Sequence, residues 1–170
     1  MPPESPAILD PKRLAVLDAY DILDTAPEEG FEDLVQLTAL ACGTPVALVS
    51  LVAVNRQWFK ARVGFPSCET DLDRSVCKFA LAEPDLLVIP DLAADPRTAG
   101  NPLVTGEPRI RFYAGAPLRS PEGHTVGSLC VIDTKPRPNG LNATQAGHLR
   151  RCARQAISLL ELRRATAEKA

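Results

Sequence analysis

The residues that could carry reactive chemistry in this sequence are its cysteines. They are Cys42, Cys68, Cys77, Cys130 and Cys152. Their number is odd, no two have Cys-x-x-Cys spacing and no paired histidines lie nearby, so the sequence predicts neither a zinc site nor a disulfide framework. Cys77 begins a short helical pattern, where a thiol has a lowered pKa and could take a redox or covalent role. The alternative, which we favour, is that Cys77 is a small buried structural residue.

The two histidines offer no general base. His124 lies in a polar turn, and His148 lies in a helical stretch beside Arg150 and Arg151. Neither has a serine or carboxylate partner at a spacing typical of a catalytic triad. We therefore identify no catalytic residue and expect a protein that is not an enzyme.

Polar side chains on two predicted strands and in one long loop are typical of a small-molecule site. Trp58 shares a strand face with Lys60 and Arg62, and could form the floor of an anion pocket or simply cover the sheet edge. Residues 91–108 form a loop too long for a mere connector. The predicted ligand-binding residues are Trp58, Lys60, Cys77, Asp91, Arg97, Asn101, Arg111 and Tyr113. The loop residues could equally hold the loop together through Asx-turns and Arg–carboxylate pairs.

Hydrophobic periodicity predicts the elements that position these residues. Apolar residues at helical spacing indicate helices over 11–22 and 28–42, the first capped by Asp10 and the second by a capping box from Thr25 to Glu28. Strands are predicted over 46–54, 58–63 and 86–89, and as a central hairpin over 109–118 and 125–133, with a short helix over 75–81. This order predicts an α+β domain with an antiparallel sheet.

The C-terminal stretch 142–170 reads as one long helix. Its apolar residues form two overlapping rows, one containing Cys152 and Leu159 and the other containing Ala153 and Leu160, while Leu149 belongs to both. A single sheet face would use only one row fully. We therefore expect a partner helix, most simply the same helix of a second subunit in a parallel homodimer.

Composition limits the classes of function. The chain has 170 residues, 45% apolar and 24% charged, and a formal net charge of -2. This length suits one domain, and the balanced charge gives no basic field for nucleic acid or a membrane surface. No apolar run is long enough for a membrane span and the start has no signal-peptide core. We expect a cytoplasmic protein with a flexible segment over 1–9.

Several motifs resemble those of the GAF domain family, in the bacterial subgroup found in sensor histidine kinases and diguanylate cyclases. They are YDILDTAPE (20–28), VSL (49–51), RQWFK (56–60), RSVC (74–77), DPR (95–97), NPLV (101–104), IRFYAGAPL (110–118) and GSLCVID (127–133). The resemblance implies a single domain over 10–163 with the GAF/PAS-like fold. In that fold a six-stranded antiparallel sheet carries the terminal helices on one face and a loop-covered ligand pocket on the other.

The resemblance implies a non-catalytic sensory domain of bacterial signal transduction. It would bind an unidentified small molecule and act through the helix over 142–170 on a downstream histidine kinase or cyclase; the cofactor, if any, is unknown. Free methionine sulfoxide reductases are also GAF domains, but their nucleophile lies in the loop before the penultimate hairpin, and residues 91–108 contain no cysteine. A reductase-like enzyme using Cys77, with Cys130 or Cys68 as resolving partner, and a ligand-free dimerisation module remain the alternatives.

Overall fold

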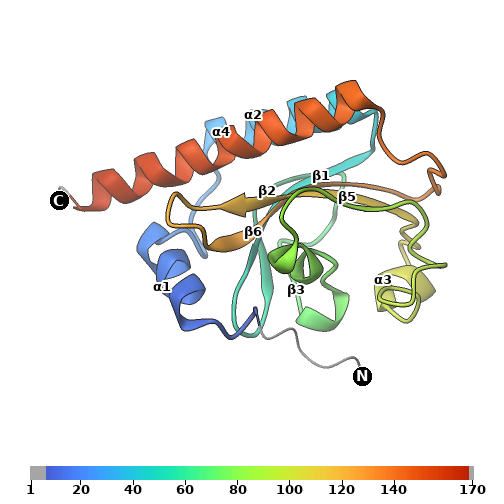
Figure 1. The fold of residues 1–170 in the computed structure, drawn as a ribbon, viewed down its shortest axis with the longest axis horizontal. Helices are drawn as coiled ribbons and strands as arrows, with labels where there is room; N and C mark the ends of the chain where they lie inside the picture. The colour runs from blue at the N-terminus through green and yellow to red at the C-terminus, as the bar shows by residue number, and fades with distance from the viewer. Residues whose placement is uncertain (1–6, 169–170) are drawn as a thin grey trace.

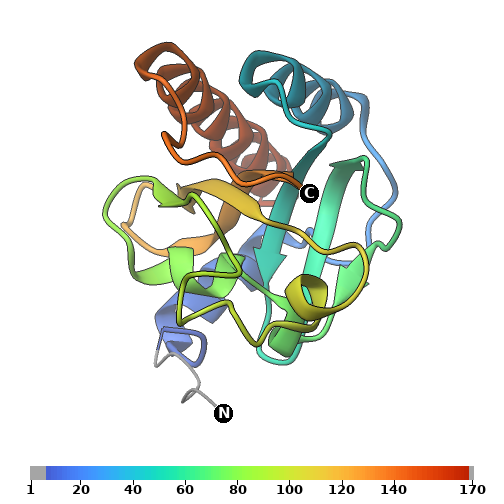
Figure 2. The same cartoon turned by 90° about the vertical axis from the view of Figure 1, so that its right-hand side faces the viewer.

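The computed structural model describes residues 7–168 and has three layers. A six-stranded antiparallel sheet in the order β3-β2-β1-β6-β5-β4 lies in the middle. Helices α2 and α4 cover one face, and short helices with long loops cover the other (Figures 1 and 2). The predicted α+β class with a six-stranded antiparallel sheet is confirmed.

The bounds of the elements follow the predicted order. The strands are β1 (Val46–Val52), β2 (Gln57–Val63), β3 (Glu69–Thr70), β4 (Leu87–Ile89), β5 (Phe112–Arg119) and β6 (Thr125–Asp133). The α-helices are α1 (Pro11–Tyr20), α2 (Glu29–Cys42), α3 (Pro102–Thr105) and α4 (Ala143–Glu168), and the 3-10 helices are η1 (Leu72–Arg74) and η2 (Cys77–Ala82). None of the helices in this described part is both long and apolar enough to pass through a bilayer.

Helix ends follow local chemistry with one exception. The Asp10 carboxylate accepts a hydrogen bond from the backbone N–H of Lys12, and α2 ends at Gly43 in the left-handed conformation that glycine adopts without strain. The predicted capping box at Thr25 is wrong. The Thr25 hydroxyl instead donates to the Ile22 carbonyl and accepts from Lys60, so α2 begins without a side-chain cap.

The central strand β1 is buried on both faces. Ala47, Val49 and Leu51 pack in the core beneath the helices, whereas Leu48 and Val52 pack beneath the loops. A strand that is apolar on both faces must be covered on both, which explains why neither layer of this domain is dispensable. β6 is buried in the same way along nearly its whole length.

A β-bulge in β2 breaks the predicted alternation. Val49 pairs with Ala61 and Ser50 pairs with Phe59, so Lys60 has no opposite residue. We predicted that Phe59 and Ala61 would share a face. Ala61 in fact joins the core beneath the helices while Phe59 lies beneath the loops, because the extra residue reverses the strand's facing.

Both apolar rows of α4 pack against other elements of the same chain, the second row only in part. The row of Leu149 and Leu160 is buried against the sheet, and Leu159 packs toward α2, where a methyl group at Gly30 would lie 3.5 Å from its δ-methyls. Helix α2 therefore covers part of the second row, and a second subunit there stays a prediction. The helix runs from Ala143 to Glu168, and the last two positions of the predicted helix lie outside the described residues.

A buried arginine fixes the N-terminal segment to the sheet. Arg13 donates through Nε to the Ala7 carbonyl (2.9 Å), and through its two Nη atoms to the carbonyls of Ile8 (2.9 Å) and Val52 (2.8 Å). Ile8 is itself buried among the residues beneath the loops. We expected a flexible segment over 1–9. Residues 1–6 of it lie outside the described part, but the packed domain begins before Asp10.

We predict that Arg13→Met lowers the free energy of unfolding by about 3 kcal/mol, since hydrogen bonds from a charged donor are worth about 1.5–3 kcal/mol each and three buried carbonyls lose their partner. Urea denaturation followed by circular dichroism measures this. Lys12→Met on the same helix is the control, because Lys12 is exposed and such a change is worth less than about 0.5 kcal/mol. Equal midpoints for the two variants would show that Arg13 is not a clamp.

Candidate functional site

The face of the sheet beneath the loops carries a buried group of hydroxyls and thiols, which we call the thiol–hydroxyl cluster: Cys77, Tyr113, Ser128 and Cys130. The Tyr113 hydroxyl lies 3.2 Å from Cys77 Sγ and 2.9 Å from Ser128 Oγ, and Ser128 Oγ lies 3.2 Å from the same sulfur. Cys130 Sγ is 3.7 Å from Cys77 Sγ. All four side chains are buried. The cluster joins η2 to β5 and β6.

Strand register brings the cluster together. Gly115 of β5 pairs with Cys130 of β6, and Pro117 pairs with Ser128, so Ser128 and Cys130 project from β6 beside Tyr113. The ring of Tyr113 lies over Gly115, where a Cβ atom would come within 2.4 Å of the tyrosine hydroxyl oxygen. Glycine at position 115 is therefore required for Tyr113 to reach Cys77.

The environment separates the acidities of the two thiols. Burial raises the pKa of the Cys77 thiol, but its hydrogen bonds with Cys130 and Ser128 outweigh burial and lower that pKa to about 6. Burial raises the pKa of Cys130, and its hydrogen bond to Cys77 raises it further. Burial likewise raises the pKa of Tyr113. These surroundings therefore favour the thiolate at Cys77 over a thiolate at Cys130, and they favour the protonated forms of Cys130 and Tyr113.

The space beside the cluster is small. A cavity of about 10 Å³ lies beneath the loops, and its polar lining residues are Gln57, Arg74, Cys77 and Tyr113. This volume is close to the least that one water molecule needs, about 10–15 Å³. A ligand the size of an amino acid or nucleotide can enter only if loop side chains move away.

The loop over 91–108 satisfies its polar groups internally. The Asp91 carboxylate accepts from the Ala93 N–H (3.0 Å), and Asp95 accepts from the backbone N–H and guanidinium of Arg97. Asn101 caps α3 by accepting from the Leu103 N–H (2.9 Å), and Arg111 donates to the carbonyls of Val104 and Ile110. The structure thus uses Asp91, Arg97, Asn101 and Arg111 to hold the loop, and ligand binding by them stays a prediction.

Trp58 and Lys60 do not lie beneath the loops. Trp58 packs in the core beneath the helices. Lys60 lies on the same side of the sheet as Trp58. Its Nζ contacts Glu28 Oε2 (2.5 Å) and donates to the Ala26 carbonyl (2.6 Å). Trp58 and Lys60 therefore lie across the sheet from Tyr113, and ligand binding by them stays a prediction. The two side chains share this side of the sheet as the two-residue period of a strand predicts, and Phe59 between them faces the loops.

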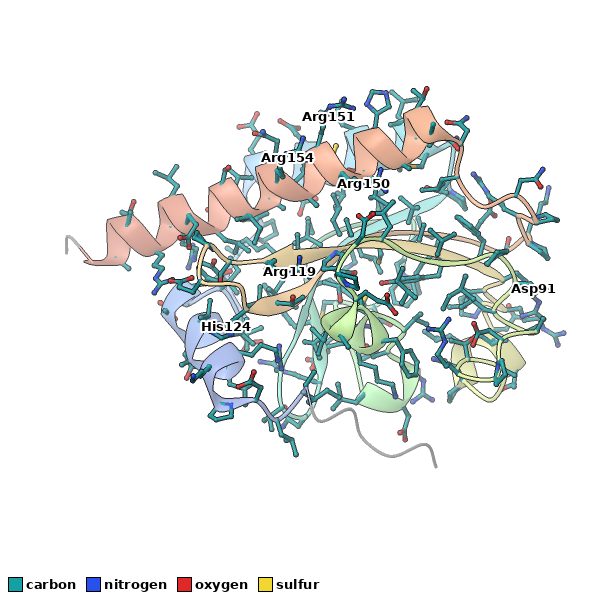
Figure 3. The ribbon with its side chains drawn as sticks, viewed as in Figure 1. Asp91, Arg119, His124, Arg150, Arg151 and Arg154 are labelled. Atoms are coloured by element: carbon teal, nitrogen blue, oxygen red, sulfur yellow. The ribbon has the colours of Figure 1, made fainter. Side chains whose placement is uncertain are left out.

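The remaining charged residues are spread over the surface. Asp91 and His124 lie toward opposite ends of the molecule, and Arg151 and Arg154 lie on α4, away from the loop-covered face (Figure 3). Arg150 of α4 pairs with Asp85 through two hydrogen bonds of 3.0 and 2.9 Å. Within residues 7–168, no group of three His, Cys, Asp or Glu side chains is arranged to hold a metal ion.

Sequence reasoning missed Ser128, and it named Cys130 only as one of two possible partners of Cys77, the other being Cys68, which is exposed. Ser128 and Cys130 stand two apart on β6, and so share a face by the two-residue period of a strand. A polar residue in an otherwise apolar strand was the available signal. The contact with Cys77 was hidden because η2 reaches β6 only through tertiary packing.

Comparison with known families identifies the class. Residues 26–160 match the GAF domain family, and the chain belongs to this family.

The relatives differ in what they do. Over 125 residues the chain is 38% identical to a cyclic di-GMP phosphodiesterase of Pseudomonas aeruginosa, a match that covers 74% of this chain and 21% of that protein. The chain therefore spans about a fifth of the length of this relative.

Two solved structures share the fold. The GAF domain of an Acinetobacter phosphoenolpyruvate-protein phosphotransferase has a TM-score of 0.64 at 16% identity, covering 92% of this chain and 97% of that one. A free methionine-R-sulfoxide reductase from Neisseria meningitidis has a TM-score of 0.63 at 18% identity, covering 89% of each chain. At these identities the likeness concerns the fold alone.

We predict that Gly115→Ala lowers the free energy of unfolding by about 2 kcal/mol, within the range of about 1–3 kcal/mol for overpacking a core. The added methyl group must push the Tyr113 ring away from Cys77. Thermal or urea unfolding measures the loss. Gly100→Ala is the matched control, because a methyl group there meets nothing within 4 Å. If both variants unfold alike, the close approach of Tyr113 to Gly115 does not exist in solution.

Proposed function

We propose that this chain is a non-catalytic sensory GAF domain of bacterial signal transduction. It binds a small molecule at the loop-covered face, acts as a dimer, and passes the change through α4 to an output module. The relative from Pseudomonas aeruginosa, of which the match covers a fifth, makes a cyclic di-GMP phosphodiesterase one candidate output. A histidine kinase and a cyclase are the others.

The observation that carries this proposal is the position of β5 between the two layers. Tyr113 projects from β5 into the thiol–hydroxyl cluster, while its neighbours Phe112 and Ala114 project into the core shared with α4. Because the cavity beneath the loops holds no more than about one water, a larger ligand must displace side chains around Tyr113. Such a ligand binds a rearranged state better than the closed one, which is the condition for a population shift.

The surroundings of Cys77 support the absence of catalysis. Its sulfur contacts only hydroxyls and a second thiol among the described residues, with no carboxylate or imidazole placed to move a proton to or from a substrate. Turnover of free methionine sulfoxide with a thiol reductant would overturn this part of the proposal if Cys77→Ser abolished it.

The support for a dimer is now the outer surface of the helix layer. Leu37 and Leu40 of α2 are 59% and 79% exposed, and Leu162 of α4 is 64% exposed. Three large aliphatic side chains left in water on one layer favour a second copy there. The row of α4 that contains Leu149 and Leu160 is buried against the sheet and is not part of this outer surface.

Ligand binding is tested by thermal shift of the domain with nucleotides, amino acids including methionine sulfoxide, and tetrapyrroles. A true ligand at about 100 times its dissociation constant adds about 2.7 kcal/mol to the free energy of unfolding. We expect at least one compound to stabilise the chain and Leu103→Trp, which fills the cavity lining, to abolish the shift. Leu162→Trp on the outer layer is the matched control and keeps it. If no compound acts, the domain is a ligand-free dimerisation module.

The dimer is tested by light scattering on Leu37→Glu/Leu40→Glu. We expect the mass to fall from that of two chains to that of one, because two buried charges cannot be accommodated in an apolar interface. Leu9→Glu/Val54→Glu is the matched control, since these residues are 53% and 51% exposed but belong to neither α2 nor α4. A monomeric parent chain, or loss of the dimer in the control pair alone, contradicts the proposal.

A further inference from the structure

Cys77 and Cys130 are a pair of thiols that the proposed sensory function does not use. Their sulfur atoms lie 3.7 Å apart, and the residues are 2% and 0% exposed. A disulfide has an S–S length of about 2.05 Å, so closing the pair requires an approach of about 1.6 Å. The two residues come from different layers, the first turn of η2 and the middle of β6.

The cluster makes the two sulfurs chemically unequal. Tyr113 and Ser128 both donate to Cys77 Sγ and stabilise its thiolate, which is the nucleophilic form of cysteine. Cys130 has the higher pKa of the two and keeps its proton. One sulfur is therefore prepared to attack and the other is held within reach to resolve the product.

The small volume of the cavity beside Cys77 limits the size of the oxidant that can reach its sulfur. The cavity of about 10 Å³ is lined by Cys77 and Tyr113, so a molecule little larger than water can approach this sulfur. A tripeptide disulfide such as oxidised glutathione cannot. Hydrogen peroxide is small and uncharged, so it is the oxidant that needs the least movement of the side chains around this cavity.

We propose that Cys77 and Cys130 form a disulfide on oxidation by hydrogen peroxide. The Cys77 thiolate attacks one peroxide oxygen, an S–O bond forms, the O–O bond breaks, and the departing hydroxide takes up the proton that Cys77 lost, giving water and a sulfenic acid. Cys130 then attacks the Cys77 sulfur, the S–S bond forms, the S–O bond breaks, and the second hydroxide leaves with the Cys130 proton as water. Two thiols lose two electrons and peroxide is reduced to two waters.

The disulfide would tie the loop layer to the sheet. η2 is a six-residue 3-10 helix, whose hydrogen bonds are weaker than those of an α-helix, so its end is the side that moves. Cys130 is held in β6 by pairing with both β1 and β5. Oxidation thus fixes the segment that a ligand must displace, and it does so without any ligand.

The test uses the full chain carrying Cys68→Ser, because Cys68 is the exposed cysteine. The reduced protein is treated with hydrogen peroxide and analysed by intact mass and by tryptic mapping without reductant. We expect a loss of two hydrogen atoms and a cross-link between the peptides 75–78 and 120–150, which contain Cys77 and Cys130. The rate should reach half its maximum near the Cys77 pKa of about 6, and oxidised glutathione should give no adduct on either residue.

Matched variants assign the residues. Cys42→Ser should leave the cross-link intact, and Cys130→Ser should abolish it while the peptide that contains Cys77 gains the mass of one oxygen atom. Where a variant folds poorly, the map of the Cys68→Ser chain decides alone. The proposal is overturned if peroxide only adds oxygen to the pair, if the cross-link joins Cys42 to Cys152, or if Cys77 and Cys130 stay reduced at peroxide concentrations that oxidise Cys68 in the unmodified chain.

Discussion

The structure depends on two adjacent strands, β1 and β6, that have no polar face. Their side chains are buried both toward the helices and toward the loops. Exposing either face would cost about 25 cal/mol for each Å² of apolar surface returned to water. The helix layer and the loop layer are therefore both obligatory parts of the core. A domain built this way cannot alter one covering layer without a response in the strands that the other layer also touches.

Sequence periodicity predicted the order of the elements because each helix and strand has its own repeat of apolar residues. Periodicity gave the wrong side of the sheet where one extra residue interrupts the alternation of side chains along a strand. The bulge at Lys60 places Ala61 on the helix side and leaves Phe59 on the loop side, although the two were predicted to share a face. A bulge depends on pairing with the neighbouring strand, and the sequence of β2 alone does not contain that information.

The apolar surplus on α4 shows a second limit of such reasoning. Two rows on one helix correctly predicted a second partner beyond the sheet, but the pattern does not say whether that partner belongs to the same chain. Leu159 of the second row packs close to Gly30 of α2, so a helix of the same chain covers part of that row. For the site, Cys77 and Tyr113 could be named from sequence, whereas their meeting with Ser128 and Cys130 required the tertiary packing of η2 on β6.

The position of Trp58 gives the chain a built-in optical reporter. It is the single tryptophan of the sequence and lies in the core on the helix-covered side, across the sheet from Tyr113. The fluorescence of Trp58 therefore reports the polarity and mobility around α2. Its indole ring makes no direct contact with anything bound beneath the loops. A shift in its emission on adding a compound would register transmission through the sheet, separately from occupancy.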